Sequence, residues 1–293
     1  MRFIYLCSTA TLPGSPTRRS DGFEHDRMMT ELRSGAPEGV EWIDIAWDDE
    51  TVEWAAFDAV MIGTTWDYWD RQDQFLDKLD EIAHKTRLFN RPELIRWNIH
   101  KSYLRDMETR GARLIPTLWL DDATPEAVAA AFDTLQSDDL VLKRQVGAGA
   151  DGQHRIKRGA PVPHLPHPMM AQPFLPAILE EGEFSFIFID GKFSHALVKR
   201  AAKGDYRIQS TYGGTDHAIT PPPDDLATAR SMLDALETPD GLPPLYARVD
   251  MLRAANGGLL LMELEAIEPF LYPLEGPGLG KRIAQALLER LGA

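Results

Sequence analysis

The sequence predicts an α/β protein that begins with an open, mostly parallel sheet and continues into an α+β part. Over the first third of the chain, short apolar segments alternate with helical segments, as strands and crossover helices do. Later, two pairs of apolar segments are joined by Asp190-Gly191 and Asn256-Gly257, which have the composition of hairpin turns. We therefore expect a parallel sheet followed by a mixed antiparallel sheet with flanking helices.

The N-terminal elements follow from apolar periodicity. Phe75, Leu79 and Ile82 recur at helical spacing and predict one apolar stripe on a helix. Runs rich in apolar and β-branched residues predict the strands between the helices. We expect strands at Phe3–Cys7, Glu41–Ile45, Asp58–Ile62 and Arg87–Phe89, and helices at Gly22–Leu32 and Arg71–Ala83.

Trp66-Asp67-Tyr68 follows one of these strands. Ligands of open α/β sheets bind outside the carboxyl ends of the strands, so this segment is a candidate for substrate contact. The two aromatic rings also fit an interface between two parts of the chain, and that alternative stays open. Asp67 is harder to explain as a core residue, because charged side chains are seldom buried without a partner.

The second part of the chain has helix caps that are readable in the sequence. Asn98 is an expected cap for a helix from His100 to Arg110, and Thr124-Pro125 opens another helix through Leu135. We divide the chain into an N-terminal domain (1–97), a small lobe (98–172) and a C-terminal lobe (173–293). Further strands are expected at Leu140–Gln145, Met169–Phe174, Phe184–Ile189, Phe193–Val198, Tyr246–Leu252 and Leu259–Glu265, and a last helix at Leu279–Leu291.

The hairpin at Asn256-Gly257 carries charged residues in a defined register. If these two residues form the turn, Asp250 lies opposite Glu263 and Arg248 lies opposite Glu265, all on one face. Three carboxylates at this spacing repel one another unless a cation lies between them, and all-oxygen ligands favour Mg²⁺. A salt-bridged surface hairpin is the alternative. The other face is expected to be apolar, with Ala247, Val249, Met251, Leu260, Met262 and Leu264.

A glycine-rich segment follows the strand that carries Lys143. Gly147, Gly149 and Gly152 match the pattern G-x-G-x-x-G, which in a dinucleotide-binding fold must be followed directly by a helix. The next residues, His154–Gly159, do not resemble a helix start. A flexible flap whose amides cover phosphates fits better. A dehydrogenase and an ordinary hairpin tip stay open as alternatives.

Composition limits the class of protein. With 293 residues the chain can bury a large core, and 44% hydrophobic and 26% charged residues are typical of a globular protein. A net charge of −14 argues against a nucleic-acid or anionic-membrane partner. The single cysteine, Cys7, lies in an apolar run and cannot form a disulfide within the chain, so we expect a cytoplasmic protein. No apolar run approaches the length of a membrane span.

The order of these motifs resembles the ATP-grasp superfamily. Within it, the chain is similar to the glutathione-synthetase-like branch that includes the D-cycloserine synthetases, to which the run from Glu263 to Pro269 is close. This resemblance implies an N-terminal open parallel-sheet domain and two α+β lobes that enclose a nucleotide. It rests on Asn98-x-x-Lys101, Lys143 with the glycine flap, Gln172-Pro173-Phe174, Gly182-Glu183, Lys199, Arg207 with Gly213-Gly214, Arg248-x-Asp250 and Glu263-x-Glu265; Ser8-Thr9-Ala10, Trp47-Asp48-Asp49 and Trp66-Asp67-Tyr68 extend it to the N-terminal part.

The resemblance also implies roles for single residues. ATP phosphates would be bound by Lys101, Lys143 and the flap with Gly147 and Gly149, the adenine edge by the backbone of Gln172, Pro173 and Phe174, and the ribose by Glu183. Lys199, Arg207 and Arg248 would be catalytic, neutralising the transferred phosphoryl group or the acyl phosphate. Asp250, Glu263 and Glu265 would hold Mg²⁺, although many relatives carry Asn where Glu265 stands, which leaves its share in the metal site open. Trp66, Asp67, Tyr68, Gly213 and Gly214 would face the substrate.

The implied function is that of an ATP-dependent, ADP-forming ligase. Such an enzyme activates a substrate carboxylate as an acyl phosphate, which a nitrogen nucleophile then attacks, with ATP and Mg²⁺ required. A cyclising ligase, in which the nitrogen belongs to the same molecule, is one alternative, and a nucleotide-binding protein without catalysis is another. We expect a small, amino-acid-like carboxylate as the partner, no nucleic acid and no membrane; a homodimer is compatible with the sequence.

Overall fold

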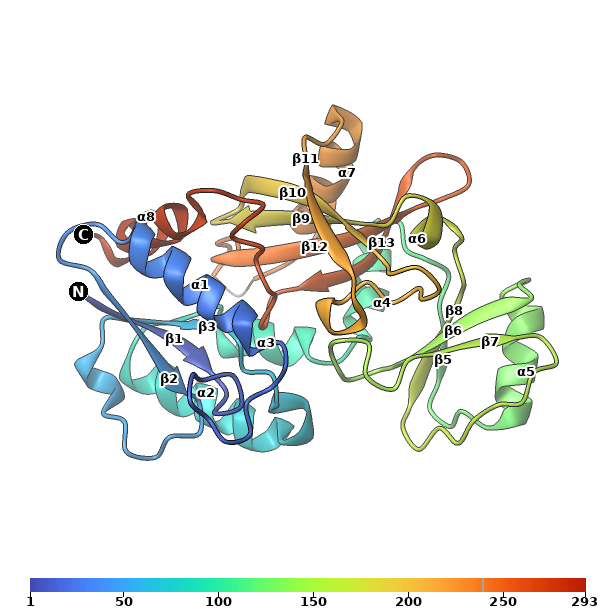
Figure 1. Ribbon diagram of the computed structural model, residues 1–293, viewed down its shortest axis with the longest axis horizontal. Coiled ribbons are helices and arrows are strands. Elements are labelled where there is room, and N and C mark those ends of the chain that lie inside the picture. Colours follow the sequence, from blue (N-terminus) through green and yellow to red (C-terminus); the bar gives the residue numbers. More distant parts are fainter. Residues whose placement is uncertain (239) are drawn as a thin grey trace.

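The computed structural model describes residues 1–238 and 240–293, which form three sheets along the long axis of the molecule (Figure 1). The first sheet is parallel, with the strand order β2-β1-β3-β4. This confirms the predicted N-terminal parallel sheet. Its strands are β1 (Arg2–Cys7), β2 (Glu41–Ala46), β3 (Ala59–Ile62) and β4 (Leu88–Phe89).

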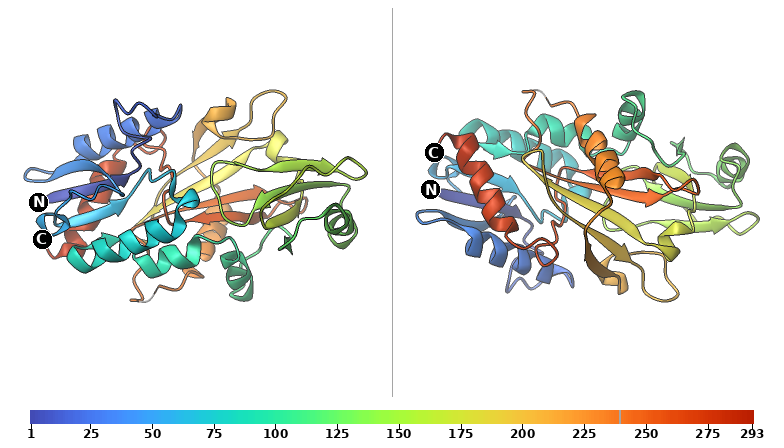
Figure 2. Two further views of the ribbon diagram at one scale, coloured as in Figure 1. Left: turned by 90° about the horizontal axis from the view of Figure 1, so that it is seen from below. Right: turned by 90° about the horizontal axis from the view of Figure 1, so that it is seen from above.

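Helices α1 (Gly22–Gly35), α2 (Gln72–Lys85) and α8 (Leu279–Leu291) cover this first sheet, with the short 3-10 helices η1 (Trp54–Ala56) and η2 (Tyr68–Asp70). Although α8 comes late in the sequence, it packs beside α1, and Figure 2 shows both ends of the chain at the same end of the molecule. The two helices are in close contact at Gly280. A Cβ atom added there would lie only 2.1 Å from the carbonyl oxygen of Glu31, so a larger residue would not fit. The last helix thus completes the core of the N-terminal sheet.

The second sheet lies at the other end of the molecule and is antiparallel, with the order β5-β8-β6-β7 (Figure 1). Helix α5 (Pro125–Thr134) covers it and begins as predicted, since Thr124 Oγ1 accepts a hydrogen bond from Ala127 N at 3.2 Å. The strands β5 and β7 were not predicted. The four strands are β5 (Leu118–Leu120), β6 (Asp139–Arg144), β7 (His154–Lys157) and β8 (Met169–Pro173).

The third sheet lies between the other two and has the order β11-β10-β9-β12-β13. The two predicted hairpins form its centre and one edge, whereas β11 and helices α6 and α7 were not predicted. All of its pairings are antiparallel. Its elements are α6 (Ala177–Glu180), β9 (Glu183–Ile189), β10 (Lys192–Arg200), η3 (Ser210–Tyr212), β11 (Thr215–Ile219), α7 (Pro223–Asp234), β12 (Tyr246–Arg253) and β13 (Leu259–Glu265).

Asn98 does not cap a helix. It is the last residue of α3 (Pro92–Asn98), and the next helix, α4 (Tyr103–Thr109), begins after a turn. Its buried side chain donates to Leu264 O and accepts from Ala266 N, both at 2.9 Å. The capping prediction is wrong because this amide satisfies backbone groups at the end of β13, far away in the sequence.

The hairpin between β12 and β13 has the predicted pairs, Asp250 with Glu263 and Arg248 with Glu265. The turn is one residue longer than predicted, because Ala254 N donates to Gly258 O. A β-bulge beyond Asp250 compensates for the extra residue and restores the register. It also places Leu260 and Met262 on the same side as Leu252, so the prediction that these two residues lie on the opposite apolar face is wrong.

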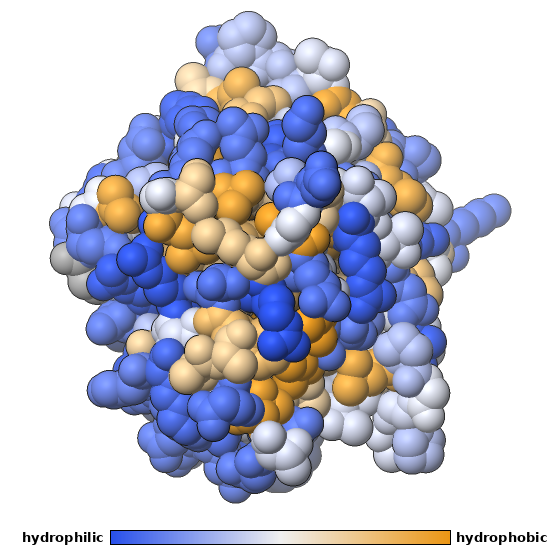
Figure 3. Space-filling model, turned by 90° about the vertical axis from the view of Figure 1, so that its left-hand side faces the viewer, coloured by the Kyte–Doolittle hydropathy of each residue, from blue (hydrophilic) through white to orange (hydrophobic). Residues whose placement is uncertain are grey.

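Over the described residues, no helix has the length and apolar character that spanning a membrane requires. Figure 3 shows the end of the molecule formed by the N-terminal sheet, where apolar patches interrupt a mostly hydrophilic surface. Exposed apolar side chains also include Leu179, Leu242 and Leu274. The homodimer stays a prediction, as do the domain boundaries at 97/98 and 172/173.

Candidate active site

A cavity of about 250 Å³ opens where the three sheets meet. It is lined by residues from every part of the chain, from Arg19 near the first strand to Tyr272 beyond the last. Most of the predicted site residues come together in it. They are Trp66, Tyr68, Lys101, Lys143, Gly147, Gly149, Gln172, Pro173, Phe174, Glu183, Lys199, Arg207, Arg248, Asp250, Glu263 and Glu265.

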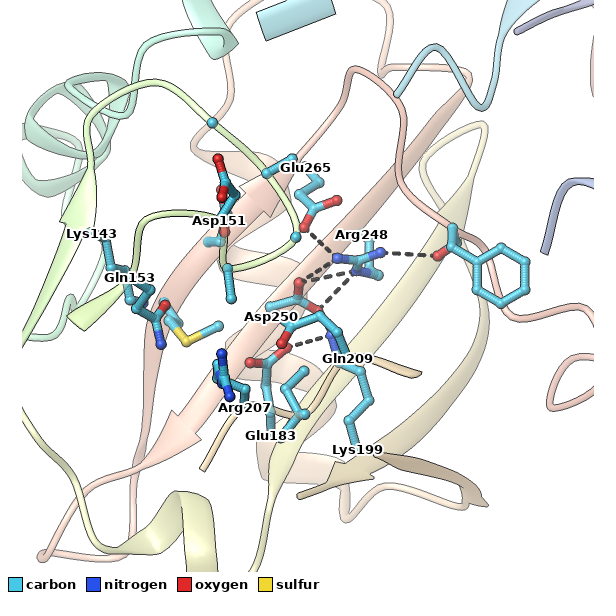
Figure 4. A pocket seen from close by; sticks show the side chains of 18 of the residues that line it. Lys143, Asp151, Gln153, Glu183, Lys199, Arg207, Gln209, Arg248, Asp250 and Glu265 are labelled. Atoms are coloured by element: carbon cyan, nitrogen blue, oxygen red, sulfur yellow. Dashed lines mark hydrogen bonds and ion pairs between the residues drawn. The ribbon is translucent and has the colours of Figure 1, made fainter. Parts of the chain in front are cut away.

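A buried ion network forms one wall of this cavity. Asp250 is 1% exposed and lies on β12, where Arg248 Nε donates to Asp250 Oδ2 at 3.0 Å and Lys199 Nζ lies 3.3 Å from Asp250 Oδ1. Lys199 also pairs with Glu183, and Ser185 donates to Asp250. In Figure 4, Arg248 lies between the carboxylates of Asp250 and Glu265.

Three members of this network, Asp250, Lys199 and Arg248, keep their charges at neutral pH. Burial alone would raise the pKa of Asp250, but the neighbouring Arg248 and Lys199 lower it to about 2. Burial likewise opposes the charge on Lys199, and the carboxylates of Asp250 and Glu183 raise its pKa above the ordinary value. The wall therefore presents fixed positive charge from Lys199 and Arg248 next to the fixed carboxylate of Asp250, whereas burial raises the pKa of Glu183 and raises that of Glu265 to about 8.

Two lysines, Lys101 and Lys143, line the cavity opposite this network. Lys101 Nζ lies 2.8 Å from Glu263 Oε1 and donates to Gly147 O at 2.7 Å, so it connects the hairpin with the glycine segment. Lys143, on β6, projects from the wall opposite Lys199 (Figure 4). Burial lowers the pKa of Lys143. An anion bound between these walls would stabilise the charged form of that amine.

The glycine segment is a loop between two antiparallel strands, β6 and β7, and is not followed by a helix. This excludes the dinucleotide-binding geometry, which needs a strand, the glycine turn and a helix in succession. Gly147 and Gly149 adopt φ values of +145° and +64°, which side chains disfavour. Arg144 Nη1 lies 2.7 Å from Asp151 Oδ2 and closes the loop on itself. The structure is that of a flap over the cavity.

A slot of apolar side chains lies beside the flap, between the second and third sheets. Gln172 is fixed there, because its Nε2 donates to Thr117 Oγ1 at 2.9 Å. Phe174 N donates a hydrogen bond to Asp139 O at 2.8 Å, so this amide already has a partner within the protein. Such a slot suits a flat aromatic base. Its apolar residues are Ile115, Val141, Phe174, Ile178, Ile208, Leu252 and Met262.

The carboxylates on the hairpin fit a divalent cation by their chemistry. Glu263 and Glu265 keep 24% and 27% of their side-chain surface exposed, and Asp250 faces Glu263 across the strand pair. Among the residues described, no three His, Cys, Asp or Glu side chains form a ready-made metal site. Mg²⁺ needs only one or two protein carboxylates beside water and phosphate oxygens, so this donor set fits it.

Three predicted substrate residues do not line the cavity. Asp67 accepts a hydrogen bond from Trp47 Nε1 at 2.8 Å and pairs with Arg71, so its carboxylate stabilises the N-terminal domain. Gly213 ends the helix η3 at φ +79°, and a Cβ atom on Gly214 would lie 1.8 Å from Ile208 O. Both glycines shape a loop. Neither lines the cavity in this structure, and their contact with a substrate stays a prediction.

Arg207 lines the cavity, but its guanidinium group is already engaged. It pairs with Asp205 at 2.7 Å and stacks on Tyr212, with Cζ 3.7 Å from the ring centroid. The side chain is 33% exposed. Arg207 would therefore have to leave Asp205, or share its donors, to reach a phosphoryl group.

Besides the predicted Trp66 and Tyr68, the N-terminal domain contributes residues to the cavity that sequence reasoning missed. Glu24, in the first turn of α1, accepts a hydrogen bond from Ser210 Oγ at 2.5 Å across a separation of 186 residues. Burial raises the pKa of Glu24 to about 7. Arg19 lies nearby and donates to Trp66 O at 3.2 Å. The position of α1 after the first strand was a usable indication, since ligands bind at that edge of a parallel sheet.

Glu268 was also given no role, although it lies within the motif run Glu263–Pro269. It lies three residues beyond the end of β13, lines the cavity and is 8% exposed. Gln209 lines the cavity as well, and its buried Oε1 has no hydrogen-bond partner among the described residues. Such an acceptor is suited to an N–H group of a ligand.

Comparisons with known proteins agree with this geometry. Residues 4–90 match the family model described as D-cycloserine synthetase DcsG, N-terminal domain. The cycloserine biosynthesis protein DcsG of Streptomyces lavendulae is 31% identical over 261 residues, covering 84% of this chain and 87% of that protein. The crystal structure of D-cycloserine synthetase DcsG superposes with a TM-score of 0.81 at 25% identity, covering 99% of this chain and 100% of that one.

A more distant structure has the same fold. D-Alanine–D-alanine ligase from Bacillus anthracis, solved in complex with ATP, superposes with a TM-score of 0.67 at 13% identity, covering 99% of this chain and 97% of that one. The fold alone is shared by many ligases, but 31% sequence identity with DcsG over most of both chains identifies the family. The chain belongs to the D-cycloserine synthetase (DcsG) family of ATP-grasp ligases.

Proposed function

We propose that this ATP-dependent carboxylate–amine ligase acts on a small, amino-acid-like acid in the cavity between the three sheets. The observation that supports the proposal most is the buried network of Lys199, Asp250 and Arg248, which faces Lys101 and Lys143 across the cavity. Positive groups on two opposite walls suit a triphosphate and a substrate carboxylate together.

In the first step, a carboxylate oxygen of the substrate attacks the γ-phosphorus of ATP, and ADP leaves. Lys101 and Lys143 would hold the phosphates, and Lys199 would neutralise charge on the transferred group. Little covalent chemistry falls to the protein, which positions the reactants and compensates charge. Glu263, Glu265 and Asp250 would hold Mg²⁺, which would supply compensation for the negative charge of the phosphates.

In the second step, the nitrogen nucleophile attacks the carbonyl carbon of the acyl phosphate, and phosphate leaves. Arg248 Nη1 donates to Phe270 O at 3.0 Å and its other nitrogens face Asp250 and Glu265, which holds the guanidinium group rigidly. A fixed cation at this place would stabilise the oxyanion of the tetrahedral intermediate. The flap would exclude water, which otherwise hydrolyses the acyl phosphate.

The N-terminal wall would select the substrate. Glu24 and Gln209 present acceptor oxygens, and Trp66 and Trp69 present flat rings, so an N–H-bearing arm of the substrate fits there. This arrangement favours an acid that carries an amino group or a similar donor.

A cyclising reaction is the second candidate. It is favoured by the match to DcsG along nearly the whole chain, because the names of that relative and of the matching structure refer to cycloserine. In that case the nitrogen belongs to the activated acid itself. A nucleotide-binding protein without catalysis is disfavoured by the complete ion network.

The test is a phosphate-release screen with ATP and Mg²⁺. Amino acids of both configurations, ureido acids and aminooxy acids are offered singly and in pairs with a nitrogen donor, and products are identified by mass spectrometry. Release with a single acid indicates cyclisation when the product has the mass of a dehydrated monomer and self-condensation when it has the mass of a dimer, and release only with a pair indicates ligation of two different molecules. Thermal shifts with ATP and with NAD provide the control, since the ligase is stabilised by ATP with Mg²⁺ and not by NAD. Stabilisation by NAD alone would contradict the proposal.

A further inference from the structure

Tyr272 lines the cavity and has a backbone conformation that tyrosine rarely adopts. Its φ value is +50°, in the left-handed region, where a bulky side chain is disfavoured. Among the non-glycine residues described, only Gln136, Ala150 and Asp190 share that region, and none of these is aromatic. Such a conformation persists where the surrounding structure enforces it, and it is concentrated at functional sites.

The loop before Tyr272 is fixed by side chains from distant parts of the chain. Its carbonyl oxygens accept hydrogen bonds of 2.8 to 3.2 Å from side chains of the N-terminal domain and of the third sheet. After the loop, Glu275 N and Gly276 N donate to Tyr272 O at 3.2 and 3.1 Å. These contacts leave the backbone of Tyr272 little freedom, so they hold it at its disfavoured φ. The acceptors are Ala266, Ile267, Glu268, Phe270 and Leu271, and their donors, in the same order, are Asn90, Tyr246, Trp66, Arg248 and His195.

The ring of Tyr272 lies beside the two cations of the buried network. Lys199 Nζ and Arg248 Cζ are both 5.7 Å from the ring centroid, a distance at which a cation is attracted to an aromatic face. Phe270 supports the ring from the side, with the two centroids 4.8 Å apart and the planes at 62°. The Tyr272 hydroxyl has no hydrogen-bond partner among the described residues, so the ring is oriented by packing and by its backbone.

Tyr272 belongs to a different part of the cavity from the adenine slot. It packs against the core of the N-terminal sheet, whereas Phe174 and the other slot residues form a separate apolar cluster. The flap covers the nucleotide side, where Gly147 O contacts Lys101 Nζ. The ring of Tyr272 therefore covers the side on which Lys199 and Arg248 would meet an acyl phosphate.

We propose that the ring of Tyr272 keeps water away from the acyl phosphate and so couples ATP consumption to bond formation; this inference rests on the proposed ligase function. In the side reaction that the ring prevents, the oxygen of water forms a bond to the acyl carbon, and the bond from that carbon to the phosphate oxygen breaks. The acid and inorganic phosphate leave with the two protons of the water, and one ATP is lost without product. An aromatic ring suits this task because it fills the space beside two cations without adding an anion that competes for them.

The test measures phosphate release and product formation in one reaction, with ATP, Mg²⁺ and the substrates found in the phosphate-release screen. Coupled turnover of the wild type gives equal amounts of phosphate and product. Tyr272→Leu removes the ring and keeps an apolar side chain at the same φ. We expect its ratio of phosphate to product to rise by about tenfold or more, with the excess released only when the acid is present. The KM for ATP should stay within about twofold of wild type, because the adenine slot and the phosphate-binding lysines are unchanged.

Three further variants separate the ring from the hydroxyl group and from the backbone. Tyr272→Phe keeps the ring, and its ratio should stay within about twofold of wild type. Tyr272→Gly removes the ring at a φ that glycine adopts freely, so its ratio should rise as in Tyr272→Leu although the backbone is relaxed. Leu274→Ala changes an exposed side chain of the same chain segment and is the control, with the wild-type ratio.

Each other outcome contradicts the inference. If phosphate release and product formation fall together in Tyr272→Leu, the residue acts on the rate of a step or on the fold. If Tyr272→Phe loses coupling as Tyr272→Leu does, the hydroxyl group matters and the ring does not. If Tyr272→Gly keeps the wild-type ratio, the effect of leucine comes from backbone strain. Excess phosphate without the acid would show that the ring protects ATP and not the acyl phosphate.

Failure of the proposed function gives a different result. If the wild type releases no acid-dependent phosphate with any acid, the ligase proposal itself fails, and the role of Tyr272 fails with it. If the wild type is coupled and Tyr272→Leu has the same ratio, only the role of Tyr272 fails.

Discussion

Lys101 connects the two halves of the nucleotide site, because its ammonium group contacts Glu263 at 2.8 Å and the carbonyl oxygen of Gly147 at 2.7 Å. One residue thus contacts both the proposed metal site and the flap. A bound triphosphate would compete with both partners for the same ammonium group. We therefore expect opening and closing of the flap to be coupled to occupation of the phosphate site.

Replacing Lys101 with methionine should test this coupling. We expect a KM for ATP raised by about tenfold or more, since a charge-assisted phosphate contact contributes about 1.5–3 kcal/mol. We also expect faster proteolysis at the flap in the absence of nucleotide. Lys85→Met, on the exposed surface of α2, is the control and should change neither quantity. Equal proteolysis of wild type and Lys101→Met would contradict the coupling.

Glu263→Gln should reduce ADP formation by on the order of 100-fold, because it removes one charged oxygen ligand from the proposed Mg²⁺ site. Its side chain is partly exposed, so the fold should survive the change. The measurement is the rate of ADP formation over a titration of MgCl₂. Glu181→Gln, which changes an exposed ion pair with Arg253, is the matched control. ATP turnover at the parent rate in Glu263→Gln would show that the metal assignment is wrong.

Glu24 should make stability depend on pH. Its pKa in the folded protein is raised from 4.5 to about 7 by burial, so the folded state binds this proton more tightly than the unfolded state. The contribution of Glu24 to stability is therefore largest in acid and is lost as pH rises from 4.5 to about 7.

Glu24→Gln removes this proton linkage. We expect its Tm, relative to wild type, to rise between pH 5 and pH 8, because only the wild type has to bury a carboxylate at the higher pH. The measurement is thermal unfolding at both pH values. Glu108→Gln, an exposed residue of α4, is the control and should show no such trend. A constant difference in Tm between Glu24→Gln and wild type would contradict the linkage.

Asn98→Ala should lower the free energy of unfolding by about 2–4 kcal/mol, because it leaves the buried groups Leu264 O and Ala266 N without partners. Chemical denaturation measures the change. Asn256→Ala, in the exposed hairpin turn, is the control and should cost less than about 1 kcal/mol. Equal effects of the two changes would contradict the role of Asn98 in joining α3 to the end of β13.

Much of the fold could be predicted because the controlling interactions are local. The β1–β4 sheet follows from short apolar runs separated by helices, and Thr124 caps α5 through a contact three residues away. Strands such as β11, which is largely exposed, lack an apolar pattern and were missed. The pairs Asp250 with Glu263 and Arg248 with Glu265 were predicted correctly although the turn was not, because the bulge beyond Asp250 offsets the longer turn.

The same distinction between local and long-range contacts explains which residues of the site could be predicted. Residues that follow one another within a motif, such as Arg248 and Asp250, could be assigned from the sequence, and they do line the cavity. Asp67 could not be placed, because its partner Trp47 comes from a separate element of the N-terminal domain, although its other partner, Arg71, is only four residues away. Glu24 could not be found, because its contact with Ser210 depends on how the first and third sheets meet. Long-range packing decides both cases.

The packing of α8 on the first sheet affects how the protein is made. Leu279, Ile283 and Leu287 belong to the same core as β1 and β3. The ribosome synthesises those strands long before it synthesises this helix, so the nascent N-terminal domain emerges with an apolar face uncovered. Chaperones that bind such faces would have a substrate throughout translation, and fraying of α8 would expose the domain that was synthesised first.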